Sequence, residues 1–99
     1  MKVAFSTTPA TQHYCTEVVE CLVRFGGVSE QDAIAFVNSY WSAEPEFTEE
    51  DFRLHEDPYY WAMWILYPFK HGYDWTQDPS RQNAPADLLE RWYGQPPTP

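Results

Sequence analysis

Three histidines and two cysteines are the side chains of this sequence best suited to catalysis. His13, His55 and His71 do not form the HxxxH or HExxH spacings of metal-dependent enzymes, and His55-Glu56 lacks the second histidine. Cys15 could pair with His13 or His71 as nucleophile and base. It lies off the apolar stripe of its predicted helix, however, and no neighbour marks its thiol as activated. We therefore expect no catalytic cysteine and no enzyme activity.

A metal site is the second kind of chemistry that the sequence could offer. His71, Asp74 and Asp78 supply nitrogen and oxygen ligands, but their spacing matches neither a zinc motif nor the calcium-binding loop. The pair Gly26-Gly27 belongs to no phosphate-binding motif and instead indicates the end of a helix. We expect neither a metal nor a cofactor.

The two cysteines also carry information about the compartment. Cys15 and Cys21 would lie about 240° apart around a helix, so they could not form a disulfide there. Free thiols are typical of a reducing compartment. The first residues, MKVAFSTTPAT, lack the pattern of a signal peptide, and the longest apolar run, residues 58–69, is too short for a membrane span. The sequence therefore predicts a cytoplasmic protein without a membrane segment.

The charge of the chain is strongly acidic. Fifteen Asp and Glu residues against six Lys and Arg give a net charge of −9 in 99 residues. This balance opposes direct binding to nucleic acid or to an anionic membrane surface, because both need cations on the protein. It favours a protein partner with a basic surface, whose encounter the charge would accelerate. The alternative is that the charge only keeps the protein in solution.

An aromatic segment stands out at residues 55–69, which read HEDPYYWAMWILYPF. On a helix over 58–67 its apolar residues would cover nearly the whole circumference, and such a helix is usually buried in a core. Tyr, Trp and Met are also the residues that protein interfaces favour. Both interpretations, a core helix and a helix that also docks a partner, remain open from the sequence.

Most acids of the middle of the chain directly precede this segment. They could simply suit the positive ends of helix dipoles, or they could form an acidic rim beside an aromatic patch. In the second interpretation the candidate partner-binding residues are Glu46, Glu49, Glu50, Asp51, Glu56, Asp57, Tyr59, Tyr60 and Trp64.

Helical periodicity begins at Ala10, after an N-terminal arm or short strand over residues 1–9. An apolar stripe formed by Tyr14, Val18, Cys21, Leu22 and Phe25 ends at Gly26-Gly27. Ser29 is a helix cap of the next helix, in which Ala33, Phe36, Val37, Tyr40 and Trp41 repeat at helical spacing. Two helices joined by so short a link should form a helical hairpin.

The second half of the sequence predicts shorter helices and more loops. Residues 42–47 form a loop, and Thr48 opens a short helix to about Glu56. Asp57 caps a new helix that starts at Pro58 and that Pro68 stops after Tyr67; alternatively, Pro58 kinks one helix over 49–67. Loop-like residues 70–84, a short helix over 85–93 and a frayed Pro-rich tail over 95–99 complete the chain.

The sequence thus predicts an all-α fold: one domain over residues 1–99, a small bundle of four to five short helices with an N-terminal hairpin and a central aromatic helix at about 58–67. For function we expect a small non-catalytic binding protein, in its most concrete form an immunity-type inhibitor that covers the basic site of a toxin or nucleic-acid enzyme. The alternative is an accessory or structural subunit that forms a homodimer through the aromatic segment.

Overall fold

The computed structural model describes residues 3–44 and 46–94, and these form one mostly helical domain. The α-helices are α1 (Pro9–Gly26), α2 (Glu30–Tyr40), α3 (Pro58–Lys70) and α4 (Ala86–Tyr93). Single turns of 3₁₀ helix are η1 (Phe52–His55), η2 (Trp75–Gln77) and η3 (Pro79–Arg81). Two very short strands, β1 (Ser6–Thr7) and β2 (Glu46–Phe47), pair in parallel, which adds to the predicted all-α bundle its one β feature in the described residues. The helical bundle itself is confirmed.

The N-terminal hairpin of α1 and α2 forms as predicted. Thr8 caps α1 through reciprocal hydrogen bonds with Thr11, a capping box that puts the start of the helix one residue earlier than the periodicity indicated. Gly27 ends α1 with φ of 65°, a left-handed conformation that a side chain would disfavour. Ser29 then caps α2, because its hydroxyl accepts a hydrogen bond from the Asp32 backbone N–H at 3.0 Å.

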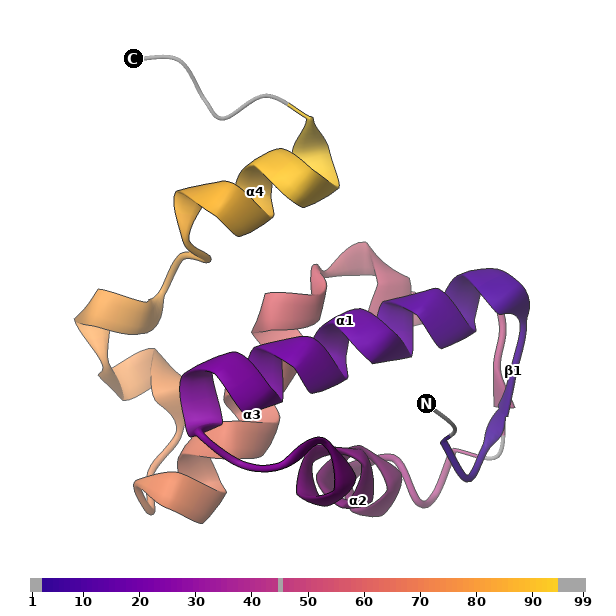
Figure 1. Cartoon of the computed structure of the whole chain (residues 1–99), viewed down its shortest axis with the longest axis horizontal. Coiled ribbons are helices and arrows are strands. Elements are labelled where there is room, and N and C mark those ends of the chain that lie inside the picture. Colours follow the sequence, from indigo (N-terminus) through magenta and orange to yellow (C-terminus); the bar gives the residue numbers. More distant parts are fainter. Residues whose placement is uncertain (1–2, 45, 95–99) are drawn as a thin grey trace.

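The core lies where α3 packs along α1, with α2 against both (Figure 1). At one end of this contact the backbone of Gly26 touches Leu66 so closely that a Cβ there would lie 2.7 Å from Leu66 Cδ1. Burial on α1 is wider than one stripe: Cys15, predicted to lie off the stripe, is fully buried. The buried apolar residues of the three helices are Cys15, Val18, Val19, Cys21, Leu22, Ala33, Val37, Tyr59, Ala62, Met63, Ile65, Leu66 and Tyr67.

A second packed region surrounds the buried side chain of Arg53. Its guanidinium carbon lies 4.0 Å from the centre of the Phe47 ring, 4.8 Å from that of Trp41 and 5.9 Å from that of Phe5. We call these three rings the aromatic box. Asp51 holds the open side of the guanidinium through two hydrogen bonds of 2.8 Å. The strands, α2 and η1 are thereby joined around one cation.

The predicted helix over 49–56 is wrong, and so is the alternative of one helix over 49–67. Only the single turn η1 forms, and its cap is Asp51 rather than Thr48. The physical reason is that Asp51 binds both the backbone N–H and the side chain of Arg53, which ties the chain into a tight turn instead of a continuing helix. The predicted start of α3 is confirmed: Asp57 caps it and Pro58 is its first residue.

Pro68 does not stop α3, contrary to the prediction. The helix continues to Lys70 with Pro68 in its last turn. A proline there removes only one backbone hydrogen bond, and the carbonyl of Tyr67 still accepts from the backbone N–H groups of His71 and Gly72, at 2.7 and 3.1 Å. Tertiary packing of the apolar turns before it maintains the helical path.

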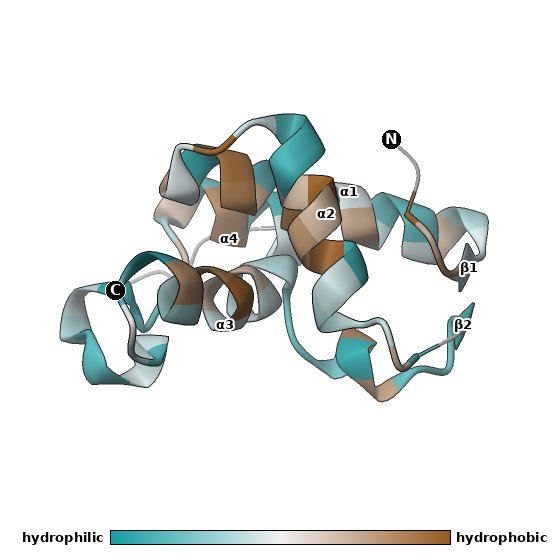
Figure 2. Cartoon of the chain, turned by 90° about the horizontal axis from the view of Figure 1, so that it is seen from below, coloured by the Kyte–Doolittle hydropathy of each residue, from teal (hydrophilic) through white to brown (hydrophobic). Residues whose placement is uncertain are grey.

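The helix α4 lies on the opposite side of α1 from α2 (Figure 1). Its attachment combines ion pairs with apolar packing, because Leu88 is buried and Leu89 and Trp92 pack against the core. Arg24 of α1 forms a two-bond ion pair with Asp87, and Arg91 reaches Glu17 at 2.9 Å. Leu88 is its one fully buried apolar residue. Figure 2 shows brown, hydrophobic ribbon on α1 as well as on α2 and α3.

No helix within residues 3–44 and 46–94 is long and apolar enough to cross a membrane. Of the predicted N-terminal arm, Val3 is buried and Ser6-Thr7 forms β1, so the short-strand alternative holds for the part that is described. The predicted frayed tail at 95–99 lies outside the described residues.

Replacing Arg53 with alanine should destabilise the fold strongly. The change leaves Asp51 without its buried partner and empties the aromatic box, so we expect a loss of about 3–5 kcal/mol in the free energy of unfolding. Urea denaturation followed by circular dichroism measures this loss. Arg24→Ala is the control, since Arg24 is exposed and should matter far less. Equal losses in the two variants would contradict the structural role of Arg53.

Candidate functional site

Six of the predicted partner-binding residues lie in one short stretch, residues 46–57, which we call the acidic segment. Glu46, Glu49, Glu50 and Glu56 are exposed there. Asp51 and Asp57 are partly buried and hold the structure instead. Asp51 binds Arg53, while Asp57 accepts hydrogen bonds from the Tyr60 backbone N–H at 3.0 Å and from the Tyr93 hydroxyl at 3.0 Å. The structure therefore separates the acids into four that face solvent and two that have structural partners.

Aromatic rings continue the surface from the acidic segment onto α3. Phe52, which is 62% exposed, packs edge-on against Trp61, and Trp61 against Tyr60. Tyr60 in turn contacts Trp64, and these three α3 side chains are partly exposed. We call Phe52, Tyr60, Trp61 and Trp64 the aromatic face. Its contact with the acidic segment brings the two predicted features together.

Tyr59 belongs to a different part of the molecule from the other candidates. Its side chain is buried, packs against Phe25 and Trp75, and donates a hydrogen bond to the Arg81 backbone oxygen at 3.0 Å. The helix that appeared apolar all round thus divides its residues: Tyr59 faces the core, while Tyr60 and Trp64 remain partly accessible.

Arg53 is the important residue of this region that the sequence pattern did not single out. Its backbone oxygen accepts from the Tyr14 hydroxyl and from the Trp61 indole N–H, both at 2.9 Å. It therefore fixes Trp61 in the aromatic face while its side chain fixes Asp51 in the acidic segment. The available sequence signal was the spacing of Asp51 and Arg53, which suits a capping carboxylate that also binds the arginine.

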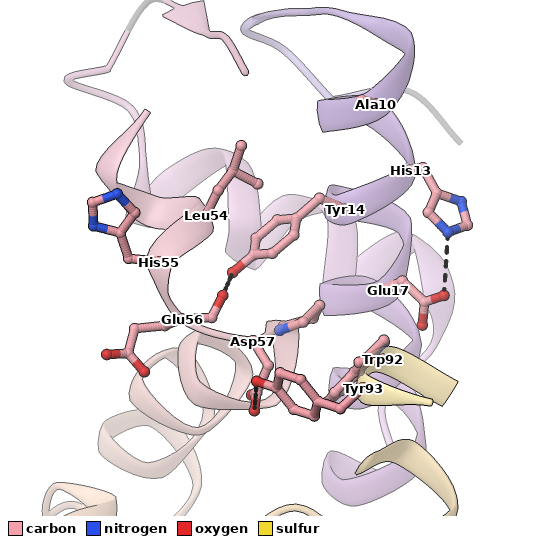
Figure 3. Close-up of a pocket in the computed structure, with 11 residues that line it drawn as sticks. Ala10, His13, Tyr14, Glu17, Leu54, His55, Glu56, Asp57, Trp92 and Tyr93 are labelled. Carbon is pink, nitrogen blue, oxygen red and sulfur yellow. Dashed lines mark hydrogen bonds and ion pairs between the residues drawn. The ribbon is translucent and has the colours of Figure 1, made fainter. Parts of the chain in front are cut away.

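A pocket opens beside the end of the acidic segment, between α1, residues 54–58 and the end of α4 (Figure 3). We call it the α1–α4 pocket; its volume is about 310 Å³. Successive turns of α1 form one wall, residues 54–57 lie across from it, and the last turn of α4 closes one end. The residues that line it are Ala10, His13, Tyr14, Glu17, Leu54, His55, Glu56, Asp57, Pro58, Trp92 and Tyr93.

Negative charge dominates the electrostatics of this pocket. Burial raises the pKa of the Tyr14 hydroxyl, and the carboxylates of Asp57 and Glu56 raise it further. The pKa of Tyr93 is raised for the same reasons. The Tyr14 hydroxyl donates hydrogen bonds to the backbone oxygens of Arg53 and Glu56, at 2.9 and 2.6 Å, so the side chain acts as a neutral donor.

The catalytic and metal candidates find structural roles. Burial raises the pKa of both Cys15 and Cys21 to about 12, so their thiols stay neutral near pH 7 and are poor nucleophiles. Asp74 and Asp78 cap η2 and η3, and His71 stacks on Tyr67. In the described part of the chain no three His, Cys, Asp or Glu residues come together in a group that could hold a metal ion.

The pairing of Asp51 with Arg53 predicts a specific acid sensitivity. Hydrogen bonds from the Arg53 side chain hold the pKa of the Asp51 carboxyl below its usual value, although burial opposes the shift. A lowered folded-state pKa stabilises the fold above the unfolded-state value of about 4, and this contribution is lost as the pH falls through the folded-state pKa. Asp51→Asn keeps the cap but removes the titrating group. Urea midpoints at neutral pH and below about pH 3 should therefore fall less in Asp51→Asn than in the wild type. Parallel losses in both proteins would assign the acid sensitivity to other carboxyls.

Comparisons of the chain with models of protein families, with curated proteins and with solved structures found no match.

Proposed function

We propose that this protein is a small, non-catalytic cytoplasmic binding protein whose partner is a protein with a basic surface. The observation that carries the proposal is the position of Phe52, which belongs to the acidic segment in the chain and packs on Trp61 of α3. Through this contact the acidic segment continues into the aromatic face. Exposed acids and partly exposed large rings side by side are the composition of a charged rim and an interface centre.

The two parts of this surface would contribute to binding in different ways. The exposed carboxylates, on a chain of net charge −9, raise the rate of encounter with a basic partner. The rings provide area that is desolvated after contact, which lengthens the lifetime of the complex. An inhibitor that covers the basic site of a toxin or nucleic-acid enzyme needs both properties, so an immunity-type role is the concrete form of the proposal.

Reversing two exposed charges should weaken capture of the partner. Glu49→Lys with Glu50→Lys leaves Asp51 and the buried Arg53 intact, and we expect slower association because the attractive field is reduced. The measurement is a tagged pull-down from the native lysate in low and high salt, with mass identification of the retained protein and association rates once it is purified.

The matched control carries Glu30→Lys and Glu90→Lys, exposed acids on α2 and α4 with the same change in net charge. We expect the control to retain the partner nearly as well as the wild type. Equal losses in both double variants would mean that net charge alone matters and would remove the acidic segment from the proposal.

A homodimer is the second candidate, and a separate apolar patch favours it. Phe69 and Tyr40 are 64% and 45% exposed, and Phe69 packs on Phe36 across the junction of α2 and α3. With Ile65 beneath them, these side chains form a surface that a second copy could cover across a two-fold axis.

Sedimentation equilibrium tests the homodimer directly. If the α2–α3 patch pairs two copies, the mass should rise toward twice that of the monomer with increasing concentration. Phe69→Ser should then restore the monomer mass, because it places a polar group in the apolar seam. A monomer mass at all concentrations would remove this candidate.

A further inference from the structure

We infer that the α1–α4 pocket receives an arginine side chain of the partner, with the guanidinium between its aromatic walls and its carboxylates. This inference rests on the proposed function in that the partner is taken to be basic. It concerns a different set of residues from the aromatic face, because none of the four rings of that face lines the pocket, so the two can be tested separately.

The size and the walls of the pocket suit a long side chain with a flat end. About 310 Å³ is at the lower end of the range of ligand pockets and is ample for one side chain. Tyr14 and Leu54 line one part, and Trp92 and Tyr93 line another (Figure 3). Aromatic faces attract a guanidinium through cation–π contact and stacking, and the apolar residues suit the methylene stem.

The tyrosine hydroxyls and the carboxylates of the pocket favour a cation over an anion. The hydroxyl of Tyr14 already donates to backbone oxygens, and that of Tyr93 already donates to Asp57, so neither is a free donor for an anion. Glu56, by contrast, has an exposed carboxylate at the edge of the pocket, and no partner for it is seen among the described residues. A carboxylate acceptor is therefore available at the edge of the pocket, and both hydroxyl donors are used; the remaining donors are the buried indole N–H of Trp92, which has no hydrogen-bond partner among the described residues, and the side chain of His55 at the rim.

The charged groups that face the pocket give it a net negative charge. Glu17, Glu56 and Asp57 line it. Arg91 adjoins it, but its guanidinium already spans Glu17 at 2.9 Å and Glu20 at 3.2 Å. His13 lies 3.5 Å from Glu17, and His55 is exposed at the rim. Charge complementarity thus points to a cationic occupant, and the flat aromatic walls favour arginine over lysine.

The first experiment titrates the ¹⁵N-labelled protein with N-acetyl-arginine methylamide and follows backbone and indole signals. We expect saturable shifts at Tyr14, Trp92 and Tyr93, with a dissociation constant on the order of millimolar, as suits a single side chain. The uncharged citrulline analogue should bind about tenfold or more weakly, because it loses the charge-assisted hydrogen bonds. The lysine analogue should lie between the two. No saturable shifts, or equal binding of the citrulline analogue, would overturn the inference.

Variants place the binding in the pocket. Asp57→Asn keeps a capping oxygen for α3 but removes one charge, and Tyr93→Ala removes an exposed wall; each should weaken the arginine probe by about threefold to tenfold. Glu30→Gln removes one exposed charge that lies outside both the pocket and the acidic segment, and it should leave the affinity unchanged. Equal weakening by Glu30→Gln would reduce the effect to a general attraction and overturn the site.

Two further outcomes separate the sources and the proposals. Free arginine, which carries its own ammonium and carboxylate, should bind no better than the capped probe; a preference of about tenfold for the free amino acid would assign the pocket to a small molecule and overturn the inference. If the capped probe fails while Glu49→Lys with Glu50→Lys still impairs partner capture, the pocket is wrong and the proposed function stands. If the probe binds while that double variant captures normally, the acidic segment is wrong and the pocket stands.

Discussion

The buried guanidinium of Arg53 is the constraint on which the second half of this structure depends. A charged group without access to water is tolerated only when it is paired and hydrogen-bonded. Asp51 supplies the opposite charge, the Glu46 backbone oxygen accepts a further hydrogen bond at 2.8 Å, and the rings of the aromatic box cover the rest. Phe47 of β2 and Phe5, directly before β1, both lie against this cation, so the pairing of the two short strands helps to form the box.

The same residue connects the helices to the acidic segment. Its backbone oxygen takes hydrogen bonds from Tyr14 of α1 and Trp61 of α3, so the turn that carries Arg53 is held from both sides. The pairing also explains why an acidic stretch can fold against an apolar core at all. Asp51 neutralises the arginine and Asp57 caps α3, while the remaining acids of the segment point to solvent. Within one stretch, therefore, some acids stabilise the fold and others remain exposed on the surface. The composition of the stretch alone did not show which acids belong to which group.

Local signals in the sequence predicted local structure well. The caps at Ser29 and Asp57 and the glycine end of α1 depend on side chains within a few residues, so the hairpin and the start of α3 could be read directly. Features that depend on distant partners could not. Cys15 is buried because α1 is packed on more than one face, and Pro68 stays in a helix because only one hydrogen bond is lost.

The candidate site shows the same division. The proximity of acids and aromatic rings follows from their adjacency in the chain, and the structure keeps it at Phe52 and Trp61. The α1–α4 pocket joins α1 to the last turn of α4, and no pattern within either helix indicates the other. Because ion pairs and the hydrogen bond between Tyr93 and Asp57 help to hold α4, one end of the pocket depends partly on polar contacts. A cation that enters between Tyr93 and the acids would therefore compete for the same carboxylate that positions the wall, so binding and the docking of α4 are physically coupled.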